Sequence, residues 1–199
     1  GGVIMSDFNR LVGSVLGIEN AIKEGAENGL KQAGARVMGA AKQKLGTYQP
    51  SIGEYPVWKV LSPQSIKAKF MSNSGSGKIK KSGKEYLKRY GAFRASGSAD
   101  DSPLVDTGAL RQAITMDTAE VSDGKVYIGV AKGKTNKKRK GKTSDVATYG
   151  AAHEYGSARR NIPPRPYLRP AVVENKEQIA EDIKNGIAEM MASFGQGRF

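Results

Sequence analysis

The stretch YGAAHEYGSARRNIPPRPYLRPAV, residues 149–172, contains the only histidine of this 199-residue chain, four arginines and three tyrosines. Three prolines within four residues favour an extended backbone there and remove amide donors. The stretch has three interpretations: an active site, a contact for nucleic acid, or a structural segment that fixes a fold and an interface. The rest of the sequence decides among them.

His153 and Glu154 invite a metal or acid–base interpretation. A zinc-protease helix carries two histidines one turn apart, so that both reach one ion. Here Ser157 stands at the second position and no other histidine exists, so we expect a partly buried histidine on a short helix. The run SNSGSGK at 72–78 lacks the first glycine and the hydroxyl residue of a phosphate-binding loop. The sequence therefore predicts no enzyme, no catalytic residue, no cofactor and no metal site.

Composition sets further limits on function. The formal net charge of +13 predicts an anionic partner or an acidic protein neighbour. The chain has no cysteine, which excludes disulfides and thiolate chemistry. No apolar run approaches the roughly 20 residues of a membrane-spanning helix. The first ten residues also lack the pattern of a signal peptide.

Apolar residues recur at spacings of three and four from Ile18 to Leu45, which predicts one long amphipathic helix ended by Gly46. Its predicted apolar stripe consists of Ile18, Ile22, Ala26, Leu30, Ala33, Val37, Ala41 and Leu45. A short separate helix is expected before it, beginning at Ser6 or Asp7. The same period predicts a C-terminal helix from Pro170 to about Phe194.

Residues 113–121 and 125–131 alternate between apolar and polar side chains, and SDG lies between them. This pattern predicts a β-hairpin with a tight turn. Residues 147–156 predict a short helix closed by Gly156. The fold class is therefore α+β, with a long amphipathic N-terminal helix and a C-terminal helix packed on a small antiparallel β-sheet, with long basic loops.

We expect a single domain over residues 1–199. Its parts are N-terminal helices at 6–45, a long loop or insert at 46–104, the hairpin region at 105–131, a basic flexible loop at 132–145, and a short helix, a Pro-rich segment and the C-terminal helix at 146–199. Within the insert, Ser62 and Pro63 predict the start of a short helix, and residues 84–93 predict another. The pair Asp100 and Asp101 is interpreted as part of a loop.

Two lysine-rich runs favour contact with phosphates, which would be salt-dependent and independent of sequence. The candidate contacts for an anionic partner are Lys132, Lys134, Lys137, Lys138, Arg139, Lys140 and Lys142. The second run, at 78–89, has Tyr86, Tyr90 and Phe93 nearby. No helix-turn-helix, zinc-finger or RNA-recognition signature is present. A small basic protein that binds nucleic acid without sequence specificity is the alternative function.

Three stretches together resemble a known family. They are PVWKVLSPQSIKAK at 56–69, SPLVDTGALRQAI at 102–114, and residues 149–172, with the predicted hairpin between the last two. In this order they resemble the head–tail joining and tail-completion proteins of tailed bacteriophages, also called tail-terminator or virion-morphogenesis proteins. The specific parts are L-x-D-T-G-x-L-R, and H-E-Y-G followed by I-P-x-R-P-Y-L. The resemblance covers roughly residues 18–194.

The resemblance implies a structural virion protein without a catalytic site. Such proteins form a ring, usually a hexamer, at the neck end of the tail, after synthesis in the host cytoplasm. The implied partners are other copies of the chain, head-connector or neck proteins, and the tail tube protein. DNA passes through the ring, which suits a basic surface. No membrane is involved.

On this interpretation the two motifs form a structural lock that fixes the last helix and sets the ring interface. Asp106 or Thr107 would cap a turn, and Gly108 would permit the bend into the hairpin. The predicted lock consists of Asp106, Thr107, Gly108, Leu110, Arg111, His153, Glu154, Tyr155, Gly156, Pro164, Arg165, Pro166 and Tyr167.

Further expectations concern contacts within the lock. Glu154 is predicted to pair with Arg165 or Arg111, because a guanidinium group offers several donors. Tyr167 and Leu168 are predicted to fill the core beside His153 and Tyr155. A ring needs two different faces on each subunit, and the hairpin and the proline segment are the candidates. The basic loops are expected to be disordered in the free protein.

Overall fold

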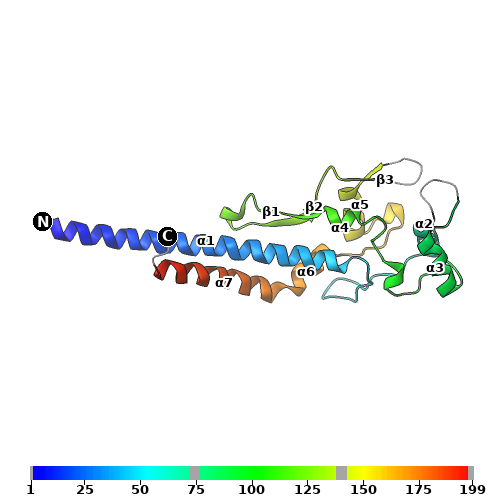
Figure 1. Ribbon diagram of the computed structural model, residues 1–199, viewed down its shortest axis with the longest axis horizontal. Helices are drawn as coiled ribbons and strands as arrows, with labels where there is room; N and C mark the ends of the chain where they lie inside the picture. Colours follow the sequence, from blue (N-terminus) through cyan, green and yellow to red (C-terminus); the bar gives the residue numbers. More distant parts are fainter. Residues whose placement is uncertain (1, 72–76, 138–142, 197–199) are drawn as a thin grey trace. The chain divides into compact units, whose positions relative to one another are not determined.

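In the computed structural model, the backbone is described for residues 2–71, 77–137 and 143–196 (Figure 1). The elements in chain order are α1 (Gly2–Lys44), α2 (Pro63–Phe70), α3 (Lys81–Tyr90), η1 (Ala99–Asp101), α4 (Ala109–Ala113), β1 (Ile114–Asp117), η2 (Val121–Asp123), β2 (Tyr127–Val130), β3 (Thr135–Lys137), β4 (Thr143–Asp145), α5 (Val146–Tyr155), η4 (Ala158–Arg160), α6 (Leu168–Glu174) and α7 (Lys176–Gly195). The predicted α+β class is confirmed, with a long N-terminal helix, a C-terminal helix and a small two-stranded antiparallel sheet.

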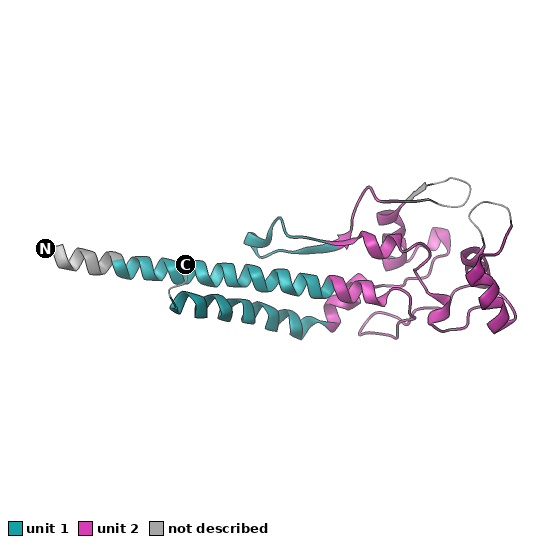
Figure 2. Cartoon of the chain, viewed as in Figure 1, with its two compact units in different colours: residues 1–37, 116–128, 175–199 teal, residues 38–115, 129–174 magenta. Residues whose placement is uncertain are grey.

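The chain forms two compact units, each assembled from separate segments (Figure 2). Unit 1 contains Gly1–Val37, Met116–Ile128 and Asn175–Phe199. Unit 2 contains Met38–Thr115 and Gly129–Glu174. The expectation of a single domain stays a prediction.

Within unit 1, α1 and α7 lie side by side and antiparallel, with their backbones in direct contact (Figure 1). A Cβ atom added to Gly186 would lie 2.3 Å from the carbonyl oxygen of Gly25. One added to Gly29 would lie 2.5 Å from the carbonyl oxygen of Asp182. Arg36 closes this contact with two hydrogen bonds of 2.7 Å to the carboxylate of Asp182. Because an added Cβ would collide with the facing backbone, glycine is required at Gly25 and Gly29 of α1 and at Gly186 of α7.

The buried line of α1 differs from the predicted apolar stripe. Ile18 and Ile22 are 38% and 43% exposed, whereas Ala21, Gly25 and Gly29 are buried. The reason is the close approach of α7, which leaves room only for small side chains. Gly25 and Gly29 therefore allow the two helices to pack closely.

Two predicted helix boundaries are wrong. The short helix expected before Ile18 is continuous with the long one, so that α1 begins at Gly2. At the other end of the chain, the single helix expected from Pro170 is two helices, because Asn175 leaves helical geometry at φ −103° and ψ 12°. The predicted stop of the long helix is confirmed, since Gly46 follows its end with φ +102°.

The predicted hairpin is present, with shorter strands than expected. The tight turn is replaced by the 3₁₀ helix η2, closed by Gly124 at φ +73°. Within unit 1, Met116 and Val126 lie against Gly34, where an added Cβ would be 2.6 Å from the Met116 sulfur and 2.8 Å from a Val126 methyl group. Gly34 therefore makes room on α1 for the hairpin.

The basic segment 132–145 was expected to be a flexible loop, and for the residues described this prediction is wrong. Strand β3 pairs antiparallel with β4, with Thr135 opposite Asp145. The backbone N–H of Val146 continues the pairing with a 2.8 Å bond to the carbonyl oxygen of Lys134. Backbone hydrogen bonds form this pair without an apolar face, so no alternating pattern marks it in the sequence. Residues 138–142 lie outside the described part of the chain.

The segment 46–104, expected to be a long loop or insert with two short helices, contains α2, α3 and η1. The helix predicted at 84–93 is α3, which begins three residues earlier and ends at Tyr90. The predicted start of α2 is confirmed: Ser62 Oγ accepts a 3.2 Å hydrogen bond from the N–H of Ser65, and Pro63 is the first helical residue. The core of the segment consists of Ile66, Phe70 and Tyr86, with Leu61, Tyr90, Phe93 and Ala95 packed against it. Residues 72–76, part of the run predicted to be flexible, lie outside the described ranges.

Candidate functional site

The three stretches that carry the family resemblance meet around α5 in unit 2. The indole N–H of Trp58, which is buried, donates a 3.1 Å hydrogen bond to the carbonyl oxygen of Pro166. A Cβ added to Gly150 would lie 2.8 Å from the Tyr167 hydroxyl and 3.0 Å from a methyl group of Leu110. Gly150 therefore leaves space on α5 for Tyr167 of the same stretch and for Leu110 of the stretch 102–114.

Arg165 fastens the proline segment to the segment before α2. Its guanidinium group donates hydrogen bonds of 3.1 Å and 2.8 Å to the carbonyl oxygen of Lys59. Its backbone N–H donates a 2.6 Å bond to the carbonyl oxygen of His153. The residue is 4% exposed, and this burial lowers the pKa of the Arg165 side chain. From its buried position, Arg165 therefore joins the proline segment to the backbone of α5 and of the segment before α2.

Glu154 holds the start of α6 in a similar way, through hydrogen bonds to backbone groups. Its carboxylate is 2% exposed and accepts hydrogen bonds from the backbone N–H groups of Tyr167 at 2.7 Å, Leu168 at 3.0 Å and Arg169 at 3.1 Å. The first amides of a helix have no partner inside the helix, so this carboxylate from α5 caps α6.

The predicted pairing of Glu154 with Arg165 or Arg111 is wrong. Glu154 pairs with Arg169, whose Nε lies 3.0 Å from Oε1. Arg165 is committed to a backbone carbonyl, and Arg111 donates to the carbonyl oxygen of Leu45. Both arginines therefore donate to backbone carbonyl groups of segments distant in the sequence.

Arg169 also lies between two aromatic rings. Its guanidinium carbon is 5.1 Å from the ring centre of Tyr55 and 4.5 Å from that of Tyr155. Tyr155 was predicted to pack in the core but is 67% exposed, because it covers the outer face of Arg169. Tyr167, in contrast, is fully buried as predicted, and burial raises the pKa of its hydroxyl.

His153, the only histidine, is largely enclosed by this assembly. Its ring meets Tyr149 edge-on at 4.5 Å between centres, and its Nδ1 is a buried atom without a hydrogen-bond partner among the described residues. Burial, together with the positive charge of Arg165, lowers the pKa of His153 to about 4. The imidazole is therefore neutral at physiological pH.

We expect the imidazole of His153 to titrate near pH 4 in an NMR titration, which is unambiguous because the chain has a single histidine. Between about pH 6.5 and pH 4 the unfolded chain binds a proton that the folded chain does not. Stability should therefore fall as the pH drops through this range, and a His153→Gln variant should lose that part of the pH dependence. A titration midpoint near 6.5 would contradict the burial of this ring.

The residues in and after the turn before α4 make most of the contacts predicted for them. Thr107 Oγ1 accepts a 3.3 Å hydrogen bond from the amide two residues further on, whereas Asp106 is exposed. Gly108 has φ +78°, which permits the bend, and Arg111 on α4 reaches back to Leu45. Gly156, at φ +79°, similarly lets the chain leave α5 with Pro164 packed against it.

Sequence reasoning missed the most heavily hydrogen-bonded carboxylate of unit 2. Asp101 is fully buried, and Oδ1 accepts from the Tyr86 hydroxyl at 2.6 Å, the Ser96 N–H at 2.9 Å and the Ser96 hydroxyl at 2.8 Å. Oδ2 accepts from the Tyr48 hydroxyl at 2.8 Å and the Gly97 N–H at 3.0 Å. Tyr48 lies 53 residues away along the chain, so no local pattern points to this contact.

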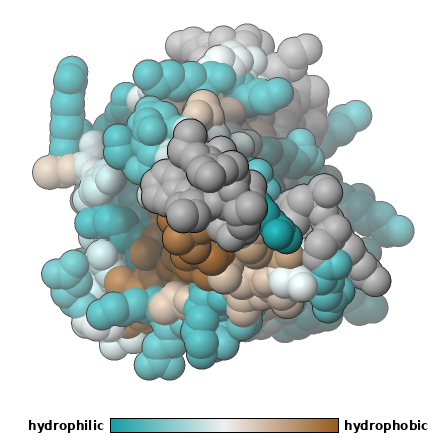
Figure 3. Space-filling model, turned by 90° about the vertical axis from the view of Figure 1, so that its left-hand side faces the viewer, coloured by the Kyte–Doolittle hydropathy of each residue, from teal (hydrophilic) through white to brown (hydrophobic). Residues whose placement is uncertain are grey.

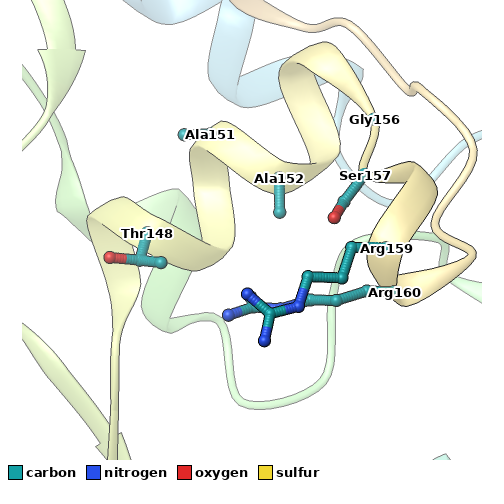
Figure 4. A pocket seen from close by; sticks show the side chains of 7 residues that line it. All are labelled: Thr148, Ala151, Ala152, Gly156, Ser157, Arg159 and Arg160. Atoms are coloured by element: carbon teal, nitrogen blue, oxygen red, sulfur yellow. The ribbon is translucent and has the colours of Figure 1, made fainter.

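An open cavity of about 540 Å³ lies beside α5 (Figure 4). It is lined by Thr148, Ala151, Ala152, Gly156, Ser157, Arg159 and Arg160. Figure 4 shows the side chains of Arg159 and Arg160 extending from η4 along one side. Both arginines are exposed, so the cavity is a basic surface hollow rather than an enclosed pocket.

The predicted contacts for an anionic partner are only partly described. Lys132 and Lys134 are exposed, and the backbone of Lys137 belongs to β3. Lys138, Arg139, Lys140 and Lys142 lie outside the described residues. The lysine-rich run on α3 presents Lys81, Lys84 and Lys88 to solvent.

Across the described ranges, no group of three or more histidine, cysteine, aspartate or glutamate side chains is placed to hold a metal ion. No helix in the described part of the chain is long and apolar enough to cross a bilayer. The chain matches no protein-family model, no curated protein sequence and no solved structure.

Proposed function

We propose that this chain is a structural protein of a tailed bacteriophage, which assembles into a ring at the head–tail interface, caps the tail and docks it to the head connector. One observation supports the proposal most directly. Trp58, Glu154 and Arg165, the polar side chains at the centre of the resemblance motifs, all bind backbone atoms of neighbouring segments. They hold the fold in one arrangement rather than face a substrate.

A rigid unit 2 suits a ring subunit. A closed ring joins two different faces of each copy, and the angle between those faces must be the same in every subunit. The lock residues tie α5, α6, the proline segment and the segment before α2 together through buried hydrogen bonds, which would fix such faces. The net charge of +13 is compatible with DNA passing through the ring.

The proposal is tested by electron microscopy of lysates from the encoding phage with an early stop codon in this gene. Filled heads beside separate tails, with tails of irregular length, are the expected result. Supplying the wild-type chain in trans should restore joined particles. Complete, normal virions in the absence of the chain would contradict the proposal.

A second candidate, binding of nucleic acid without sequence specificity, is favoured by the exposed face of Lys81, Lys84 and Lys88 on α3. Such binding would weaken steeply with salt, because each phosphate contact releases counterions. Affinity for duplex DNA measured over a salt series distinguishes the two functions. Tight binding with a steep slope supports this candidate, and weak binding by the free chain supports the ring.

A further inference from the structure

Four large apolar side chains on the N-terminal half of α1 face solvent. Leu11, Val15, Ile18 and Ile22, here called the α1 seam, are 61%, 56%, 38% and 43% exposed. Val12 and Leu16 flank the seam and are 40% and 53% exposed. Figure 3 faces this end of the molecule and shows apolar side chains gathered there. Contiguous exposed apolar surface of this kind marks a site of association.

Helix α7 covers only part of α1. Near the end of α7, a Cβ added to Gly17 would lie 2.4 Å from the ring of Phe194, one residue before that helix ends. At Gly13 nothing described lies within 4 Å. A helix in water needs packing on one face to be stable over such a length. The part of α1 that extends past α7 therefore requires a partner on its apolar face.

The spacing of the seam identifies the kind of partner. Its residues are separated by four, three and four positions, the a/d spacing of a coiled coil. In the sequence the same spacing continues back through Phe8 and Ile4. The a position Val15 is β-branched and the d position Leu11 before it is leucine, a combination that favours two parallel strands. A surface of this pattern accepts a second helix with the same repeat.

We propose that α1 pairs through this seam with α1 of a second copy of the chain, as a short parallel coiled coil. Identical helices in parallel place each seam residue against its own counterpart, so the seam is complementary to itself. Charge favours the same partner. The chain carries a net +13, but between Leu11 and Ile22 the only charged residue is Glu19. Two copies can therefore approach here without strong repulsion.

The size of the seam sets the expected strength of pairing. Four seam residues and two flanking residues are fewer than the roughly 20–30 residues on each side of a standard interface. We therefore expect a pair that forms and dissociates with concentration. The contact goes beyond the ring proposed above, because a ring joins two different faces whereas the seam joins the same face of two chains.

The test is sedimentation velocity of the full chain over a wide concentration range. The double variant Val15→Glu, Ile22→Glu places like charges in both a layers of the seam and should weaken pairing by about tenfold or more. Both residues are exposed, so folding should be unaffected. The matched control is Asn20→Glu, Asn28→Glu, which adds the same charge to exposed positions off the seam and should leave pairing within about twofold.

Two further experiments separate a loss of pairing from a loss of folding. Mixing the Glu double variant with Val15→Lys, Ile22→Lys should restore pairing, which a misfolded chain could not do. Because the chain has no cysteine, Ile18→Cys should give disulfide-linked pairs under mild oxidation, while Asn20→Cys should not. Pairing of the Glu variant equal to that of its control would overturn the proposal. So would a wild-type chain that stays monomeric at every concentration. None of these results depends on the role of the chain in a phage.

Discussion

Replacing Glu154 with glutamine should destabilise unit 2 by about 2–4 kcal/mol, because each buried amide left without an acceptor costs about 1–3 kcal/mol. The carboxylate accepts the amides of Tyr167, Leu168 and Arg169, and the Nε of Arg169. Glutamine has nearly the same shape, but its NH₂ group would point a donor at other donors. Losing the cap on α6 also leaves the first amides of that helix without partners.

Fluorescence of Trp58 during denaturant unfolding measures this effect. Trp58 is the only tryptophan, is buried, and is hydrogen-bonded to the proline segment that Glu154 helps to hold. The matched control is Glu181→Gln, at an exposed pair with Lys184, which should change stability by less than about 0.5 kcal/mol. Equal unfolding midpoints for the two variants would contradict the capping role of Glu154.

The parts of the fold that the sequence predicts are those with local causes. The helical period, the stop at Gly46 and the cap at Ser62 all depend on residues within a few positions of one another, and all are confirmed. The buried face of α1 was predicted less well, because a hydropathy stripe selects large residues such as Ile22. The partner helix instead selects small ones such as Gly25, through a backbone contact that becomes visible only when both helices are placed.

The lock residues show the same difference between contacts with local causes and contacts with distant segments. Glu154 and Arg165 are buried and hydrogen-bonded in unit 2, but the predicted partner of Glu154 was wrong. Side-chain chemistry predicts a guanidinium partner, Arg165 or Arg111, for the carboxylate of Glu154, whereas its main partners are backbone amides. Backbone donors carry no signature in the sequence. Pairings that depend on them follow from the path of the chain, which side-chain chemistry alone does not reveal.

Replacing Asp101 with asparagine should destabilise unit 2 by a similar amount, about 2–4 kcal/mol, because it leaves a buried backbone N–H without an acceptor. Its carboxylate is fully buried and accepts five hydrogen bonds, from the Tyr48 and Tyr86 hydroxyls, the N–H and hydroxyl of Ser96, and the N–H of Gly97. Hydroxyl groups can rotate to accept from an amide, but the two backbone N–H groups cannot. The segment around α3 would then lose the group that joins it to Tyr48.

The pH dependence separates the charge of Asp101 from its shape. Burial would raise the pKa of this carboxyl, but hydrogen bonds from Tyr86, Ser96 and Tyr48 outweigh burial and hold it below its usual value. The stabilisation is therefore complete above about pH 4 and is lost as the pH falls toward the depressed pKa of the folded state. The difference in unfolding free energy between wild type and Asp101→Asn should shrink over that range. For the exposed control Asp123→Asn it should stay near zero throughout. A difference for Asp101→Asn that does not change with pH would mean that packing, rather than the ionised carboxylate, holds this segment.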